Sequence, residues 1–134
     1  MIISEKKSRD REISNILDNL SHDMTENSRR EEERFLNMYP NDMEATVLKK
    51  LNHVSKGTIF HNSFRRVKSQ EFPDLVSEDT KCGIEVKQTK GDHWSTVGNS
   101  IMEGSRVDQI DNIYLFFAKL NSPIMYKWKK YEEI

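Results

Sequence analysis

The chain has 134 residues, which is about the size of one domain, and 35% of them are hydrophobic while 32% are charged. The sequence contains no apolar run long enough to span a membrane and no apolar signal-peptide segment near Met1, and its single cysteine excludes a disulfide framework and a cysteine-based zinc cluster. We therefore expect a cytoplasmic protein with no membrane partner.

Charge is distributed unevenly along the chain. Residues 1–44 carry seven Lys or Arg against eleven Asp or Glu, a net charge of −4, whereas residues 45–134 carry fourteen against eleven, a net charge of +3. An acidic N-terminal part thus precedes a mildly basic body. This asymmetry permits a surface that binds polyanions without requiring one.

The N-terminal segment 1–39 is predicted to be a charged helical leader that precedes a folded core at 40–134. Residues 8–36 contain neither Gly nor Pro. Apolar side chains recur there at the spacing of one helix face, at Ile13, Ile16, Leu17, Leu20 and Met24. We expect one or two helices, packed loosely on the core or used against a partner.

The core is predicted to begin with a helix, capped by Asn41 or Asp42 and running to about His53. Residue types then favour strands at 58–61, 72–76, 82–87, 113–118 and 124–128, a polar loop at 88–98 and a helix at 99–107. This order predicts an α/β (α+β) fold, with a central mixed β-sheet flanked by helices and an N-terminal helical extension.

Candidate chemistry gathers on the strand at 82–87. Glu85 and Lys87 are two residues apart and so share one face of a strand. A polar turn at 78–81 would pair this strand with the preceding one and place Asp74 beside Glu85. Two close carboxylates need a cation, and hard oxygen ligands suit Mg²⁺ or Mn²⁺. A neighbouring lysine can assist an attacking water, so these are the parts of a metal-dependent phosphodiester hydrolase.

The same residues carry a resemblance. Pro73-Asp74, ten further residues and then Glu85-Val86-Lys87 resemble the PD-(D/E)xK motif of restriction-endonuclease-like nucleases. The core of that family is a helix, a meander of three strands, a second helix and one more strand, and the elements expected over 42–118 follow this order. The resemblance therefore implies a restriction-endonuclease-like core.

The resemblance also implies roles for single residues. Asp74 and Glu85 would bind Mg²⁺, for which Mn²⁺ can substitute, together with the backbone carbonyl of Val86, and Lys87 would be the catalytic lysine. Glu44 would supply a further metal ligand from the first core helix. Gln88 would support the site.

Double-stranded DNA is the expected partner. Lys90, Ser95 and Thr96 follow the catalytic strand, and Arg65 and Arg66 form a basic group, so these side chains are candidates for contacts with phosphates or bases. A homodimer would match the two-fold symmetry of a palindromic site.

The expected function is a metal-dependent endodeoxyribonuclease, with a type II restriction endonuclease, or its catalytic portion, as the leading form. A repair- or resolvase-type nuclease is an alternative, and so is a degenerate core that only binds DNA. A non-enzymatic partner-binding domain would instead use its leader, and Glu85 and Lys87 would be a surface ion pair. The sequence leaves open DNA or RNA, and one metal ion or two.

Overall fold

Five strands form one mixed sheet in the computed structural model, which describes residues 2–68, 71–91, 105–106 and 109–131. The order across the sheet is β1 (Arg65–Arg66), β3 (Leu75–Ser77), β4 (Cys82–Thr89), β6 (Asn112–Lys119) and β7 (Met125–Lys130). Strands β4 and β6 are parallel, and the other neighbours are antiparallel. The prediction of a mixed α/β chain with a mixed sheet is confirmed.

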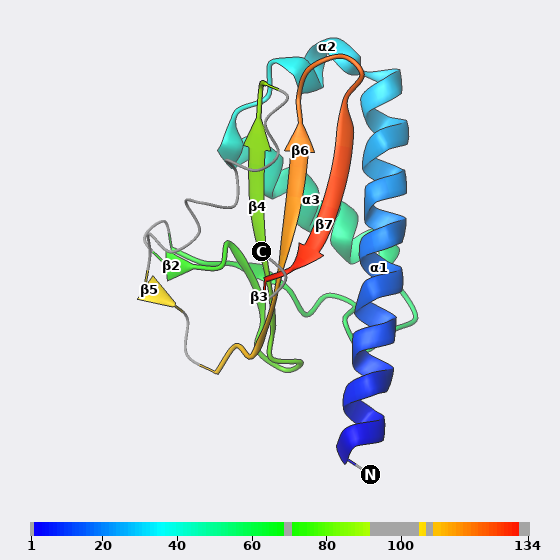
Figure 1. Cartoon of the computed structure of the whole chain (residues 1–134), viewed down its shortest axis with the longest axis vertical. Helices are drawn as coiled ribbons and strands as arrows, with labels where there is room; N and C mark the ends of the chain where they lie inside the picture. Colours follow the sequence, from blue (N-terminus) through cyan, green and yellow to red (C-terminus); the bar gives the residue numbers. More distant parts are fainter. Residues whose placement is uncertain (1, 69–70, 92–104, 107–108, 132–134) are drawn as a thin grey trace.

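Three helices precede the sheet in the chain: α1 (Ile2–Arg30), α2 (Glu32–Leu36) and α3 (Pro40–Val54). In the view of Figure 1, α3 lies behind β6 and β7, and α1 runs alongside β7. No helix in the described part of the chain combines the length and the apolar character that a membrane crossing requires.

The apolar face predicted for the N-terminal segment is buried in full. Its five members, Ile13, Ile16, Leu17, Leu20 and Met24, are each at most 2% exposed. They belong to the same apolar cluster as Met43, Val47 and Leu51 of α3 and Ile84 of β4. The helix itself is confirmed, whereas the expectation of loose packing is wrong, because this face is part of the main core.

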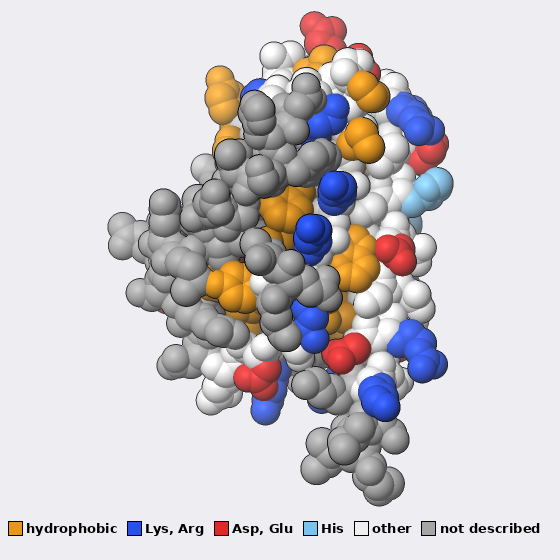
Figure 2. Space-filling model, viewed as in Figure 1, with side chains coloured by type: hydrophobic (Ala, Val, Ile, Leu, Met, Phe, Trp, Pro, Cys, Tyr) orange, Lys and Arg blue, Asp and Glu red, His pale blue; other side chains and the backbone are white. Residues whose placement is uncertain are grey.

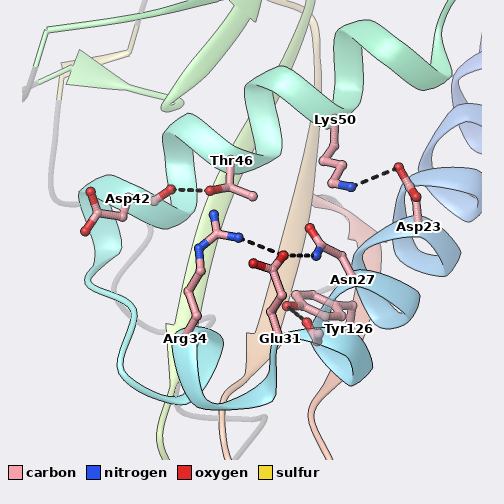
Figure 3. Close-up of polar contacts among 9 residues, drawn as sticks. Asp23, Asn27, Glu31, Arg34, Asp42, Thr46, Lys50 and Tyr126 are labelled. Atoms are coloured by element: carbon pink, nitrogen blue, oxygen red, sulfur yellow. Dashed lines mark hydrogen bonds and ion pairs between the residues drawn. The ribbon is translucent and has the colours of Figure 1, made fainter.

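Polar contacts also attach α1 to its neighbours. The Trp128 indole on β7 donates to the Asp18 carboxylate at 2.8 Å, and the hydroxyls of Ser28 and Tyr126 are hydrogen-bonded at 2.6 Å. Figure 3 shows the side of α1 that faces α3, where Lys50 lies 3.6 Å from Asp23. These contacts fix the helix against both the sheet and α3.

The sheet is apolar on both faces. Tyr114 and Phe116 of β6 pack with the helices, while Leu115 and Phe117 belong to a second cluster on the opposite face. Strand β6 is therefore buried on both sides, as its nearly all-apolar sequence predicts. The register places Glu85 opposite Leu115, and thus on the face that carries the second cluster.

The segment 58–61 is not the predicted strand but a series of turns. The Thr58 hydroxyl donates to the Ser55 carbonyl at 2.7 Å and accepts from the Phe60 N–H at 3.1 Å. Local side-chain bonds of this kind compete with strand pairing and stabilise turns. The predicted capping residues of α3 are also wrong, because Tyr39 is the N-cap and Pro40 occupies the first turn.

The predicted strand 72–76 is divided by a bend at Pro73 and Asp74. Before the bend, β2 (Glu71–Phe72) pairs with β5 (Ser105–Arg106) in a separate two-stranded sheet, and after it β3 joins the main sheet. The predicted loop 88–98 starts late, since β4 continues to Thr89, and its residues 92–98 lie outside the described part. Of the predicted helix 99–107, the two described residues form β5.

Candidate active site

The hairpin of β3 and β4 brings two carboxylates together. Leu75 pairs with Ile84, so Asp74 lies at the end of the hairpin next to Glu85. The backbone N–H of Asp74 donates to Glu85 Oε1 at 3.0 Å, and Asp74 Oδ2 accepts from the backbone N–H of Val86 at 2.9 Å. This is the juxtaposition that the turn at 78–81 predicts.

Glu85 is almost completely withdrawn from solvent, with 5% of its surface exposed. A buried carboxylate is costly unless donors or cations satisfy it. Here the Lys87 ammonium lies 3.2 Å from Glu85 Oε2, and the Asp74 N–H reaches the other oxygen. Glu85 and Lys87 share a strand face, as predicted, and they form an ion pair at the rim of the second apolar cluster.

Asp74 titrates far from its ordinary range. Burial and the neighbouring charge of Glu85 raise the pKa of Asp74 from 3.8 to about 7, against the opposing effects of the Val86 N–H and Lys87. The hydrogen bonds from the Asp74 and Val86 N–H groups hold the two carboxylates next to each other. Near neutral pH the pair therefore binds a proton readily, and a metal cation would compete for the same position.

Glu44 approaches this pair from the second turn of α3. Its Oε1 accepts from Arg66 Nη2 at 3.1 Å. Burial and the charge of Asp74 raise the pKa of Glu44, while Arg66 and Lys87 act in the opposite direction. Glu44 thus shares an electrostatic environment with the Asp74–Glu85 pair, although its carboxylate is directed to Arg66.

The donors of this site fit a hard divalent cation by their chemistry. Asp74 and Glu85 offer carboxylate oxygens, and the Val86 carbonyl is directed to the same edge of β4, because the N–H and C=O of one strand residue point the same way. Mg²⁺ commonly uses one or two carboxylates and completes its shell with water and phosphate. Within the described ranges, no group of three or more His, Cys, Asp or Glu side chains is arranged to hold a metal ion.

Two residues predicted near the site point elsewhere. The Gln88 amide donates to the Met38 carbonyl at 3.0 Å, and the Lys90 ammonium donates to the carbonyls of Leu36 and Met38. Gln88 is three residues from Glu85 and therefore lies on the opposite face of β4. Both side chains hold the connection between α2 and α3, so Gln88 does not support the carboxylate pair.

The other residues predicted to contact DNA divide into two groups. Arg65 and Arg66 lie on the short edge strand β1, and each is held by a carboxylate, Glu78 at 2.6 Å for Arg65 and Glu44 for Arg66. Their side chains are 51% and 40% exposed, respectively. Ser95 and Thr96 lie outside the described residues.

Gly83 is a part of the site that the sequence prediction missed. A Cβ atom at this position would lie 2.3 Å from Pro73 Cγ and 3.0 Å from Ile110 Cγ2. The missing side chain therefore lets Pro73, the residue before Asp74, pack directly on β4. A glycine inside a strand is the signal that could have indicated this close approach.

Comparison of the chain with protein-family models, with curated proteins and with solved structures finds no match. Its function must therefore be inferred from the side chains of this site, from their placement on the sheet and from the motif in which they occur.

Proposed function

We propose that this chain is a Mg²⁺-dependent endonuclease that hydrolyses phosphodiester bonds of double-stranded DNA. The proposal depends on one observation, the contact of Asp74 with Glu85 beside the Lys87 ammonium. An isolated turn residue or a surface ion pair would not require two carboxylates in contact at the end of a hairpin. The spacing of these residues resembles the PD-(D/E)xK motif, whose members use them for this reaction.

The order of the strands supports the same resemblance. Strands β1, β3 and β4 follow α3 and form an antiparallel meander, and β6 then pairs with β4 in parallel. A restriction-endonuclease-like core has a helix, a three-strand meander, a helix and a further strand. A parallel pair needs a long crossover, and the chain between β4 and β6 is long enough to provide one. We therefore propose this core for residues 40–134.

Each residue of the site has a distinct role in the proposed reaction. Asp74 and Glu85 would hold the cation through carboxylate oxygens, with the Val86 carbonyl as a third donor. Bound there, Mg²⁺ would add positive charge beside a phosphodiester and make a water molecule more acidic. The Lys87 ammonium would donate to the attacking water or to a phosphate oxygen that gains charge. Its ion pair with Glu85 sets its position before substrate binds.

Basic side chains support a polyanionic substrate. Lys127 and Lys129 of β7 are in register with Phe117 and Leu115, so they lie on the same sheet face as Glu85 and Lys87. Figure 2 shows Lys and Arg side chains gathered over the middle of this face. Phosphate contacts from such residues favour DNA binding that weakens as salt rises. Within this class we favour a type II restriction endonuclease that acts as a homodimer on palindromic sites.

The non-enzymatic alternative would use the helices instead. A polar groove of about 520 Å³ lies between α1 and α3, lined by Asp23, Asn27, Glu31, Arg34, Thr46, Lys49, Lys50 and His53. Figure 3 shows two ion pairs within this groove, Asp23 with Lys50 and Glu31 with Arg34. Such internal pairing leaves less charge for a partner, so the groove supports this alternative less well than the carboxylate pair supports a nuclease.

A cleavage assay tests the proposal. Plasmid DNA, a mixture of linear duplexes and structured RNA are incubated with the purified chain and millimolar Mg²⁺, with and without EDTA. We expect DNA cleavage that EDTA abolishes and that Asp74→Asn and Glu85→Gln each lower by at least about 100-fold. Asp79→Asn is the matched control, because Asp79 lies exposed in the turn of the same hairpin.

Cleavage that both active-site variants retain would show that the reaction belongs to another site or to a contaminant. Cleavage of RNA alone would assign a different substrate to the same residues. DNA binding without any cleavage would identify a nuclease core that has lost its activity, and the proposed reaction would be wrong.

A further inference from the structure

Arg66 and Arg65 are adjacent in sequence and have different electrostatic partners. The Arg66 guanidinium crosses to α3 and binds Glu44 at 3.1 Å, whereas Arg65 remains at the sheet edge and binds Glu78 at 2.6 Å. Arg66 is in register with Leu75, the residue after Asp74. One arginine of the pair is therefore part of the carboxylate site, and its neighbour is not.

Each of the three carboxylates at the site has a partner supplied by the chain. Lys87 neutralises Glu85, the backbone N–H of Val86 binds Asp74, and Arg66 neutralises Glu44. The Glu44 side chain is only 20% exposed, so its charge needs a nearby cation. With its carboxylate bound to Arg66, Glu44 is not grouped with Asp74 and Glu85 as a metal ligand, in keeping with the lack of a three-ligand group among the described residues.

We propose that Arg66 is a latch that stands in for the metal ion at Glu44. In the metal-free protein its guanidinium holds the Glu44 carboxylate, and when a divalent cation binds to Asp74 and Glu85, Glu44 exchanges Arg66 for the metal. The inference rests on the proposed metal site and adds a residue that competes with the metal. Arg66, once released, presents a planar donor group to a phosphate of the bound DNA.

A competing latch has a measurable signature. Since Arg66 must leave Glu44 before Glu44 can bind the metal, the ion pair lowers metal affinity by its own stability. A partly exposed pair of this kind corresponds to a change of about three- to fivefold in affinity. Removing the guanidinium should therefore strengthen metal binding, and only while Glu44 is present.

The experiment is a calorimetric titration of the metal-free protein with Mn²⁺. It compares five proteins: wild type, Arg66→Gln, Arg65→Gln, Glu44→Gln and the double variant of Arg66 and Glu44. We expect Arg66→Gln to bind Mn²⁺ about three- to fivefold more tightly than wild type, and Arg65→Gln to change the affinity by less than about twofold. In the Glu44→Gln background, Arg66→Gln should have no further effect, because the two residues act as one unit.

Three results would overturn the latch. Equal effects of Arg65→Gln and Arg66→Gln would show that only the general field of a positive charge acts on the metal. An effect of Arg66→Gln that persists in the Glu44→Gln background would also show that only the general field acts. Weaker Mn²⁺ binding by Arg66→Gln than by wild type would show that Arg66 supports the structure of the site. Arg66→Met serves as a second variant if the glutamine variant does not fold, and it should bind Mn²⁺ more tightly than wild type, because methionine keeps an apolar stem but has no positive charge to hold Glu44.

Failure of the latch is distinguishable from failure of the proposed function. Asp74→Asn, titrated in the same way, provides the distinction: if wild type binds Mn²⁺ and Asp74→Asn does not, the metal site stands whatever the Arg66 variants show. If none of the proteins binds Mn²⁺, the metal site and the latch are both wrong.

Discussion

Two hydrogen bonds from main-chain N–H groups hold the carboxylates of Asp74 and Glu85 next to each other. The Asp74 N–H donates to Glu85 Oε1 at 3.0 Å, while the Asp74 carboxylate accepts from the N–H of Val86, one residue beyond Glu85. The Glu85 carboxylate is therefore fixed by the main chain at Asp74, and the Asp74 carboxylate is fixed by the main chain next to Glu85. Two acids held in this way form a site before any ligand arrives, whereas mobile surface acids would separate to relieve their repulsion.

Gly83 should be required for this arrangement. Gly83→Ala places a Cβ atom 2.3 Å from Pro73 Cγ, so either the proline or β4 must shift, and Asp74 shifts with it. We expect a loss of about 1–3 kcal/mol in the free energy of unfolding and a clear loss of Mn²⁺ affinity. Urea denaturation and calorimetry measure the two effects.

Gly57→Ala is the control for the Gly83 variant. Gly57 has a φ of +84°, so alanine costs about 1 kcal/mol of backbone strain there, but nothing lies within 4 Å of the added Cβ atom. The Gly57 variant should therefore lose stability and keep its Mn²⁺ affinity. If Gly83→Ala also keeps that affinity, the contact with Pro73 does not position Asp74.

The stability of the metal-free protein should fall as pH rises. The pKa of Asp74 is raised from 3.8 to about 7 in the folded state by burial and by Glu85, so the folded protein favours the protonated acid. This contribution is fully present below a pH of about 4 and is lost as pH rises through about 7. At the proposed site Mg²⁺ would take the place of the proton, so it should stabilise the protein more at a pH of about 8 than at about 5.

Thermal unfolding of wild type and Asp74→Asn at the two pH values isolates this effect, because asparagine does not titrate. The melting temperature of wild type should fall more between acid and alkaline pH than that of the variant, and only wild type should regain stability with Mg²⁺. Asp79→Asn, in the exposed turn, should behave as wild type. Parallel curves for wild type and Asp74→Asn would contradict the assigned pKa.

Lys87 should act in the reaction more than in metal binding. Lys87→Met removes the ammonium that lies 3.2 Å from Glu85 and leaves both carboxylates in place. We expect Mn²⁺ binding to persist, and even to strengthen, while cleavage falls by at least about 100-fold. A variant that loses metal binding and cleavage together would show that Lys87 only maintains the structure.

Helix α1 should unfold together with the sheet. Leu17 is fully buried in the main cluster, so Leu17→Ala should cost about 2–5 kcal/mol in a single cooperative transition in urea. Asn19→Ala, on the exposed side of the same helix, should change stability by less than about 0.5 kcal/mol. A two-step curve in which only the first step responds to Leu17→Ala would show that α1 folds independently.

Periodic patterns in the sequence were sufficient to predict the longest helix and the most deeply buried strand. The helix face that begins at Ile13 and the all-apolar strand around Phe116 both appear where their patterns predict them. The strand expected at 58–61 failed because the Thr58 hydroxyl forms local bonds that β-branched propensity does not take into account. The tight packing of α1 depends on tertiary contacts with α3 and β7, which its own sequence does not specify.

The candidate site was also predictable from the sequence only in part. Contact between Asp74 and Glu85 follows from two short-range facts, the turn at 78–81 and the two-residue period of a strand. The pair of Glu44 and Arg66 joins residues 22 apart on a helix and an edge strand, and no local pattern indicates it. The placement of Gln88 was predictable from strand parity, because it is an odd number of residues from Glu85.

Binding of Mn²⁺ to the metal-free protein tests the central claim most directly, because it requires neither the target sequence nor a second subunit. Calorimetry on wild type, Asp74→Asn and Glu85→Gln, with Asp79→Asn as control, should show binding by wild type and by the control that both active-site substitutions abolish. Binding that survives substitution of Asp74 and Glu85 would contradict the account, and so would the absence of binding in wild type.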